Sequence, residues 1–180
     1  MSDFEGEKSA MIRALSGNAS VVDGVRLRLP DVTFEKTLTL DLGRRSVELH
    51  HYGHANTPGD TVAYVPESKT AWIGNLLLGE KTIPWAIEGK MQAYQDTINK
   101  MANTLDIKTI VPGHVLISDH TLLDTYAQYL KGDIQDVRDA IEEGESLRKT
   151  LAALPLAENY LAPKDSALAP QREVFQGFHC

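Results

Sequence analysis

The hydrophobic pattern from Val25 onwards changes from mainly strand-like to mainly helical at about Asn75, and this change restricts the folds that the chain can adopt. From Val25 to Asn75, apolar and polar residues alternate, as in Leu38–Leu42 and Val47–Tyr52. Alternation with a period of two predicts half-buried strands. After Asn75, apolar residues recur every three or four positions, which predicts helices with one buried side. Strands followed by helix, strand and helix predict a mixed α/β layer protein.

Short runs of alternating or apolar residues, separated by turn residues, predict six strands. They are Val25–Leu29, Leu38–Leu42, Val47–Tyr52, Thr61–Val65, Thr70–Gly74 and Lys108–Val111. The turn at residues 42–46 joins the second and third of these into a hairpin. Pro66 and the Pro112–Gly113 pair end the strands that precede them.

Three segments have the period of a helix. The first runs from about Phe4 to Leu15, and the second from Met91 to Leu105. The third runs from Asp119 to about Leu154, although Gly132 and Gly144 weaken the expectation of one unbroken helix. The expected buried stripes are Met91, Tyr94, Ile98, Met101 and Leu105 on the second helix, and Leu123, Tyr126, Leu130, Ile134, Val137 and Ile141 on the third.

These elements predict three parts of the chain: a helix and connector at 1–24, a main domain at 25–154 and an irregular tail at 155–180. The length of 180 residues fits one compact domain with a sizeable core.

The net charge of −7, with no basic patch, makes nucleic acid an unexpected partner. The sequence contains no apolar run of membrane-spanning length and does not begin like a signal peptide, so we expect no membrane contact and a cytoplasmic location. The single cysteine, Cys180, permits no internal disulfide, which suits a reducing compartment.

Residues capable of chemistry gather in two segments. One is His50–Asp60, between two expected strands, and the other is Val111–His114, at the end of a strand. Four of the six histidines lie there, and histidine is the commonest ligand of transition metals. The sequence has no His-x-His, His-Glu-x-x-His or Cys-x-x-Cys motif, no nucleophile elbow and no phosphate-binding loop. From the residues alone, structural histidines and metal ligands both remain open.

The order of several short segments resembles the metallo-β-lactamase superfamily. The matching segments are 29–34, 38–43, 47–53, Asn-Thr-Pro-Gly-Asp at 56–60, Ile-Gly-Asn-Leu-Leu at 73–77 and Val-Pro-Gly-His at 111–114. The resemblance implies an αβ/βα sandwich. It begins after the place of the family's His-x-His-x-Asp-His motif, so the expected sandwich is incomplete and lacks the N-terminal strands and that motif.

The same resemblance implies where metal ligands would lie. Asn56 stands where the family has a histidine, Asn75 stands where it has the bridging aspartate, and His114 matches a family ligand. Asp60 also matches a family residue, which we interpret as a turn-forming aspartate. A carboxamide offers one neutral oxygen and cannot bridge two cations. We therefore expect no cofactor, with His114 and His54 as the candidates if zinc binds weakly.

These residues favour a degenerate enzyme that is metal-free or weakly assisted by metal. It would be a hydrolase, or a cyclase or lyase, acting on a small ester, lactone, thioester or amide. The candidate catalytic residues are His114, His54, Asn56 and Asn75, and the candidate substrate-binding residues are His51 and Trp85. The alternatives are a non-catalytic pseudoenzyme that binds a small molecule or stabilises a partner, and a zinc-dependent hydrolase completed by another chain.

A sandwich without its first strands would expose apolar sheet surface and open edges, which proteins avoid. We expect a second copy of the chain, or else a second subunit, to cover that surface, unless the chain is a fragment. Trp72, Trp85 and Tyr94 either line a pocket or fill the core, and the core is the favoured interpretation.

Overall fold

The computed structural model describes residues 12, 20, 24–26, 28–80, 82–86, 90–146 and 148–150. The chain divides into two compact units, residues 1–34 and residues 35–180. The expected N-terminal helix, apart from Ile12, and the tail at 155–180 lie outside the described residues. None of the described helices is both long enough and apolar enough to cross a membrane.

The expected strand at Val25–Leu29 is wrong. The described residues of this range form no strand, and Val25 and Leu29 are 47% and 69% exposed. Alternating residues form a stable strand only where neighbouring strands accept their backbone hydrogen bonds and cover one face. Among the described residues of the first unit, no strand offers such a pairing.

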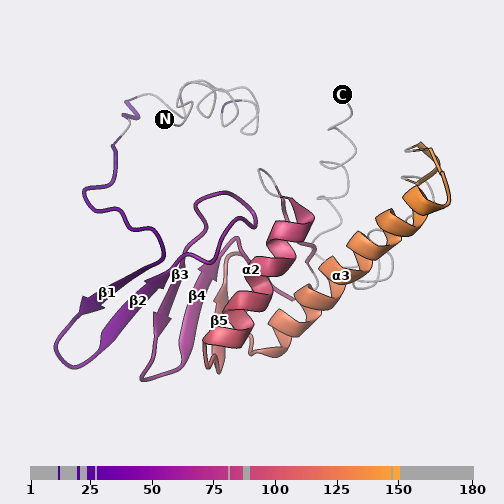
Figure 1. Ribbon diagram of the computed structural model, residues 1–180. Helices are drawn as coiled ribbons and strands as arrows, with labels where there is room; N and C mark the ends of the chain where they lie inside the picture. The colour runs from indigo at the N-terminus through magenta and orange to yellow at the C-terminus, as the bar shows by residue number, and fades with distance from the viewer. Residues whose placement is uncertain are drawn as a thin grey trace. The chain divides into compact units, whose positions relative to one another are not determined.

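The second unit contains a five-stranded sheet whose spatial order follows the chain (Figure 1). The strands are β1 Thr37–Asp41, β2 Ser46–His50, β3 Val62–Val65, β4 Thr70–Gly74 and β5 Thr109–Pro112. Strands β1 to β4 form an antiparallel meander, and β5 lies parallel to β4. A parallel neighbour requires a crossover, which the helix α2, Met91–Thr104, supplies. The expected mixed α/β architecture is confirmed.

The turn between β1 and β2 sets the register of the hairpin. Gly43 has a φ of +84°, which a residue without a side chain adopts without steric cost. The Gly43 N–H donates to Asp41 Oδ1 at 2.7 Å, and the Leu42 N–H donates to the Arg45 carbonyl at 2.9 Å. With this turn in place, Leu40 lies opposite Val47, and both point to the same face of the sheet.

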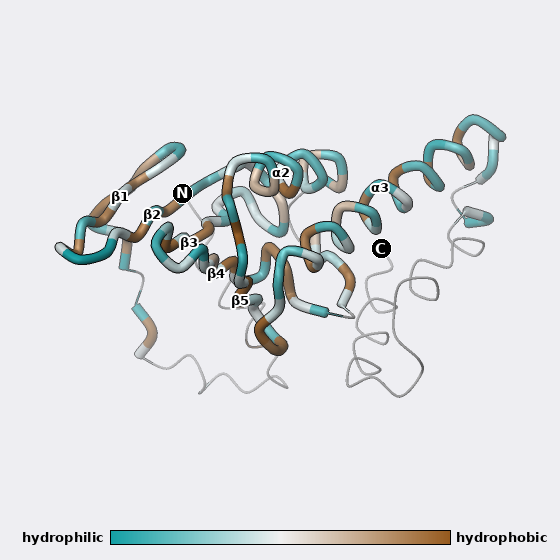
Figure 2. The backbone as a smooth tube through the Cα atoms, turned by 90° about the horizontal axis from the view of Figure 1, so that it is seen from below, coloured by the Kyte–Doolittle hydropathy of each residue, from teal (hydrophilic) through white to brown (hydrophobic). Residues whose placement is uncertain are grey.

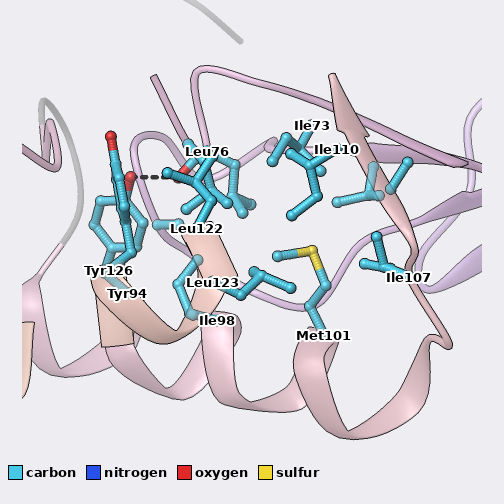
Figure 3. Packing of buried hydrophobic residues seen from close by; sticks show 14 of the residues in the cluster. Ile73, Leu76, Tyr94, Ile98, Met101, Ile107, Ile110, Leu122, Leu123 and Tyr126 are labelled. Carbon is cyan, nitrogen blue, oxygen red and sulfur yellow. Dashed lines mark hydrogen bonds between the residues drawn. The ribbon is translucent and has the colours of Figure 1, made fainter. Parts of the chain in front are cut away.

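The two long helices, α2 and α3 (Thr121–Glu142), lie on one face of the sheet and pack against each other (Figures 1 and 2). The expected stripe on α2 is confirmed, because Tyr94, Ile98 and Met101 are fully buried (Figure 3). The sheet supplies the facing residues of the core, which are Val62, Tyr64, Ala71, Ile73 and Ile110.

The expected helix from Asp119 to Leu154 is too long at its C-terminal end. Helix α3 ends at Glu142, and Gly144 follows it with a φ of +71°. The Glu145 N–H then donates to the Ala140 carbonyl at 2.9 Å, which completes a glycine-based helix stop. A side chain in this left-handed conformation would be strained, so Gly144 marks the true end of the helix.

The buried stripe of α3 is also shorter than expected. Leu130 is fully buried, but Val137 and Ile141 are 41% and 70% exposed. Figure 1 shows why: the last turns of α3 run past the end of α2, so α2 cannot cover them. The helical period identifies which side of α3 is apolar, but it does not show how far the neighbouring element extends.

The side chains on the sheet face opposite the helices are more exposed to solvent than those on the helix-covered face. Among its residues, Trp72 is 46% exposed and Leu40 is 44% exposed. The core assignment of Trp72 is therefore wrong, whereas that of Tyr94, which is fully buried, is confirmed. Trp85 is half-buried in the segment that follows β4.

Asp133 gives the fold a testable pH dependence. It lies on α3 and is 8% exposed, and desolvation by burial raises its pKa from 3.8 to about 6 despite a hydrogen bond from Tyr129. A raised carboxyl pKa means that the folded state holds its proton more tightly than the unfolded state. The unfolding free energy should therefore fall as pH rises from about 4 to about 6, and then level off.

Asp133→Asn removes this titration and should stabilise the protein at pH 7 by on the order of 1 kcal/mol. Urea unfolding at pH 4.5 and pH 7 measures the difference. Asp124→Asn, an exposed acidic position in the first turn of the same helix, is the control. An equal pH dependence in wild type and Asp133→Asn would contradict the assignment.

Candidate active site

The sheet register gathers three loops at one edge of the sheet. His50 at the end of β2 pairs with Val62 at the start of β3, and Gly74 at the end of β4 pairs with Pro112 at the end of β5. Residues 51–61, 75–80 and 113–117 therefore begin or end at the same edge. In α/β folds, sites lie in the loops beyond such strand ends.

A histidine, an asparagine and a tryptophan from these loops lie together. His114 Nε2 lies 3.1 Å from Asn75 Oδ1, and the rings of His114 and Trp85 meet edge to face at a centroid distance of 6.2 Å. A carboxamide oxygen can only accept, so His114 Nε2 is the donor. In the neutral imidazole, Nδ1 then carries the free lone pair. Both His114 and Asn75 are exposed to solvent.

Backbone contacts fix the position of His114. The Gly113 and His114 N–H groups donate to the carbonyls of Leu77 and Leu78, each at 3.1 Å. No side chain fits at Gly113, because a Cβ there would lie 2.6 Å from Asn75 Oδ1 and 2.8 Å from the Gly74 carbonyl oxygen. The close approach of the two loops at Gly113 is what allows Asn75 to reach His114.

Two buried tyrosines hold the loop that follows Asn75 (Figure 3). Tyr94 of α2 donates its hydroxyl to the Leu76 carbonyl at 2.6 Å. The hydroxyl of Tyr126 of α3 accepts from the Leu78 N–H at 3.1 Å and contacts the hydroxyl of Thr82. Burial raises the pKa of both tyrosines, so both hydroxyls stay protonated and able to donate. The sequence pattern placed both residues in the core but carried no signal for this polar role.

The loop at residues 51–61 is held by its own hydrogen bonds. The Asp60 carboxylate accepts from the Thr57 N–H at 2.9 Å and from the Thr57 hydroxyl at 3.0 Å, as expected for a turn-forming aspartate. His51 Nδ1 donates to the Asp60 carbonyl at 2.8 Å. The His54 carbonyl accepts from Thr97 of α2 at 2.8 Å, while the His54 side chain is exposed.

Asn56 lies in this loop but is closed off from solvent. It is 2% exposed, and its Nδ2 has no hydrogen-bond partner. Among the described residues, no hydrogen bond joins His51, His54 or Asn56 to His114 or Asn75. The structure therefore brings Asn75 and Trp85 each against His114, and places the other three candidates at the same edge without a hydrogen bond, among the described residues, to His114 or Asn75.

The described side chains do not fit a catalytic zinc site. In the part of the chain that the structure describes, no group of three histidine, cysteine, aspartate or glutamate side chains is placed to hold a metal ion. A catalytic zinc takes about three protein ligands and an open position. His114 directs Nε2 to Asn75, and Glu80, in the loop that follows Asn75, accepts a hydrogen bond from Ser118 at 3.0 Å.

Comparison with solved structures identifies the fold. A metallo-β-lactamase from Pontibacter korlensis matches with a TM-score of 0.53 at 21% identity, over 68% of this chain and 62% of the other. The DIM-1 metallo-β-lactamase matches with a TM-score of 0.50 at 19% identity, over 55% and 46%. A double mutant of the sec-alkyl sulfatase PisA1 matches with a TM-score of 0.61 at 14% identity, over 74% and 24%.

The chain therefore has a metallo-β-lactamase-like fold, as the sequence predicted. It spans less than two thirds of the length of each of these structures. No protein-family model matches the sequence, and no curated protein matches it.

The tyrosine support of the site loop can be tested by removing one hydroxyl. Tyr94→Phe leaves the buried Leu76 carbonyl without its donor, which should cost about 1–3 kcal/mol of unfolding free energy. Chemical denaturation measures the loss. Tyr52→Phe is the control, because Tyr52 is half-buried and its hydroxyl accepts a hydrogen bond from the side chain of Thr104 at 2.9 Å, near the end of α2. Equal losses in the two variants would argue against a special role for Tyr94.

The close approach at Gly113 gives a second test. Gly113→Ala must displace Asn75 or the Gly74 backbone, and should cost about 1–3 kcal/mol. Gly59→Ala meets no atom within 4 Å and should change stability by less than about 0.5 kcal/mol. Thermal unfolding compares the two. A Gly113→Ala variant as stable as the wild type would contradict the described packing.

Proposed function

We propose that this chain is a metal-independent acid–base enzyme that acts on a small carbonyl compound at the edge carrying His114, Asn75 and Trp85. The observation that carries the proposal is the 3.1 Å hydrogen bond from His114 Nε2 to Asn75 Oδ1. It fixes the ring and its tautomer and leaves Nδ1 as a base. A base oriented by a third group is the arrangement that general-base catalysis requires.

Each neighbouring group has a role in this proposal. His114 Nδ1 takes a proton from a water or from a nucleophile within the substrate, which then attacks the carbonyl carbon. The Asn75 amide N–H groups donate to the oxyanion that develops on the carbonyl oxygen. When the tetrahedral intermediate collapses, the proton on Nδ1 passes to the leaving group. Attack by water gives hydrolysis of an ester, lactone, thioester or amide, and attack by an internal nucleophile gives a cyclisation.

Two buried hydrogen-bond donors without partners favour a substrate that carries hydrogen-bond acceptors. Asn56 Nδ2 and Trp85 Nε1 are buried and have no hydrogen-bond partner. Buried donors in folded proteins are almost always paired, so each orphan indicates an acceptor that the described residues do not provide. A carbonyl or carboxylate oxygen of a bound molecule would satisfy such a donor. For Trp85, whose ring meets that of His114, this agrees with the carbonyl chemistry proposed for His114.

The test is turnover of a panel of small esters, lactones and thioesters, with and without a chelator. Wild type should be unaffected by the chelator, and His114→Ala should lose about 100-fold or more of kcat/KM. His120→Ala removes an exposed histidine at the start of α3 and should leave activity unchanged. Activity that vanishes with the chelator, or that survives in His114→Ala, would overturn the proposal.

Asn75→Asp tests the orienting role separately from metal binding. A carboxylate still accepts from His114 Nε2 and, being charged, raises the pKa of the imidazole. The acidic limb of the pH–rate profile should therefore move to higher pH, and kcat should fall because a carboxylate has no N–H to donate to the oxyanion. Asn75→Ala should lower kcat without moving the acidic limb to higher pH. The metal content of each variant, measured by elemental mass spectrometry on protein purified without chelator, shows whether the aspartate has created a metal site instead.

One observation favours a second candidate, a non-catalytic binding module. Asp60 accepts hydrogen bonds from the N–H and the hydroxyl of Thr57, so this residue of the family-like segment serves the structure of its loop. A binding module should bind carbonyl compounds, with a change in tryptophan fluorescence, and turn none of them over. A zinc-dependent hydrolase completed by another chain, the third candidate, would instead carry close to stoichiometric metal.

A further inference from the structure

We propose that Thr37, His50 and Glu48 form a second reactive site, in which the Thr37 hydroxyl is a nucleophile toward small activated esters. Thr37 Oγ1 lies 3.4 Å from His50 Nδ1, and His50 Nε2 lies 2.8 Å from Glu48 Oε2. A nucleophile, a base and a group that orients the base, in this order, define the sites of hydrolases that form a covalent acyl intermediate. The site is separate from that of His114, because β3 and β4 lie between β2 and β5, a separation of roughly 14 Å across the sheet.

The strand register brings the three side chains together. Thr37 lies directly opposite His50 in the β1–β2 hairpin, and Glu48 lies two residues before His50, on the same face of β2. The His51 N–H donates to the Lys36 carbonyl at 2.8 Å, which makes these two residues a hydrogen-bonded pair. The next pair, Thr37 and His50, is therefore a non-hydrogen-bonded pair, in which opposite side chains approach most closely. The contact follows from the strand pairing itself.

The three side chains lie on the helix side of the sheet, at its outer end. Glu48 and His50 lie opposite Tyr64 and Val62 of β3, which belong to the hydrophobic core. Strand β1, which carries Thr37, is the edge strand (Figure 1). Thr37 is exposed, whereas the side chains of His50 and Glu48 are only 14% and 31% exposed. The nucleophile is thus accessible, while the base and the carboxylate are partly shielded from water, which strengthens their interaction.

The partners of His50 fix its tautomer and its orientation. A carboxylate only accepts hydrogen bonds, so His50 Nε2 carries a proton and donates it to Glu48. In the neutral imidazole, the lone pair of Nδ1 then faces the Thr37 hydroxyl. Tyr52 stacks on the imidazole at a centroid distance of 5.5 Å and an interplanar angle of 10°, and its own hydroxyl accepts a hydrogen bond from Thr104 of α2. The contact of 3.4 Å is long, as nucleophile–base contacts often are without substrate.

The reaction is cleavage of an ester through an acyl-threonine. Thr37 Oγ1 attacks the carbonyl carbon while its proton passes to His50 Nδ1, and Glu48 stabilises the imidazolium that forms. The bond from the carbonyl carbon to the leaving oxygen then breaks, and Nδ1 gives the proton to that oxygen. Water attacks the acyl-threonine in the same way and releases the acid. The register directs the Thr37 N–H away from β2, where it is placed to donate to the oxyanion.

The position of Thr37 also indicates the substrate class. Because Thr37 lies on an exposed edge strand, a substrate gains little binding energy there. We therefore expect small esters with a good leaving group, whose cleavage depends on the reactivity of the nucleophile more than on tight binding.

Covalent labelling of the full chain with a fluorophosphonate probe, which mimics an activated ester, tests the proposal. Attack by Thr37 Oγ1 on phosphorus breaks the P–F bond and leaves the phosphonyl group on the threonine, with loss of fluoride and a proton. Peptide mass spectrometry should locate the adduct at Thr37 in folded protein, and labelling should be at least about tenfold slower in protein unfolded with urea. No adduct at Thr37, or equal labelling of the unfolded chain, would overturn the proposal.

Substitutions at the two reacting groups assign their roles. Thr37→Val keeps the shape of the side chain without the hydroxyl, and His50→Gln removes the base, so each should abolish the adduct. Thr37→Ser keeps the hydroxyl and should form it. Thr39→Val is the matched control, because Thr39 is an exposed threonine on the same face of β1, opposite Glu48. It should label as wild type does, and unchanged labelling in His50→Gln would contradict the proposal.

Glu48 is a positioning residue, and its test separates orientation from stability. The amide of a glutamine can donate as well as accept, so in Glu48→Gln the tautomer with its proton on Nδ1 becomes available. Labelling should slow at least about tenfold, while the thermal unfolding midpoint stays close to that of wild type. An unchanged labelling rate would mean that Glu48 and His50 only stabilise the hairpin, and would overturn the site. The mechanism proposed for His114 forms no covalent intermediate, so either result leaves that proposal unaffected.

Discussion

The hydroxyl groups of Tyr94 and Tyr126 take the place of water for the backbone of the loop after β4, and the candidate site depends on them. Each comes from a different helix, and together they satisfy the Leu76 carbonyl and the Leu78 N–H in the protein interior. The same loop then accepts the Gly113 and His114 N–H groups through its other carbonyls. The helices thus position His114 indirectly, by fixing the loop on which it rests.

The sequence predicted those parts of the fold that short-range patterns determine. Strands β1 to β5 and the buried side of α2 follow from alternation and helical period, which neighbouring residues specify. The strand expected at Val25–Leu29 failed because a strand requires a partner, and alternation carries no information about one. The exposed end of α3 failed for a related reason, since Val137 and Ile141 continue the apolar period beyond the reach of α2.

The candidate site was predicted in part, through resemblance rather than through the residues alone. Short segments at strand ends singled out Asn75 and His114, and strand pairing then brings them to one edge. The hydrogen bond between them, the burial of Asn56 and the contact of Trp85 with His114 depend on loop conformations. Loop conformation arises from contacts between segments far apart in the chain, such as Gly113 against Asn75, and no local pattern encodes these.

The strand order has a consequence for how the chain is made. Strands β2, β3 and β4 each pair with the strand just before them, so the meander can assemble strand by strand as the chain leaves the ribosome. Strand β5 can join only after α2 has been synthesised and has crossed the sheet. Until then a nascent chain leaves exposed the apolar residues of β3 and β4 that α2 later covers, and it lacks His114. Molecular chaperones are therefore expected to engage this chain most strongly between the synthesis of β4 and that of β5.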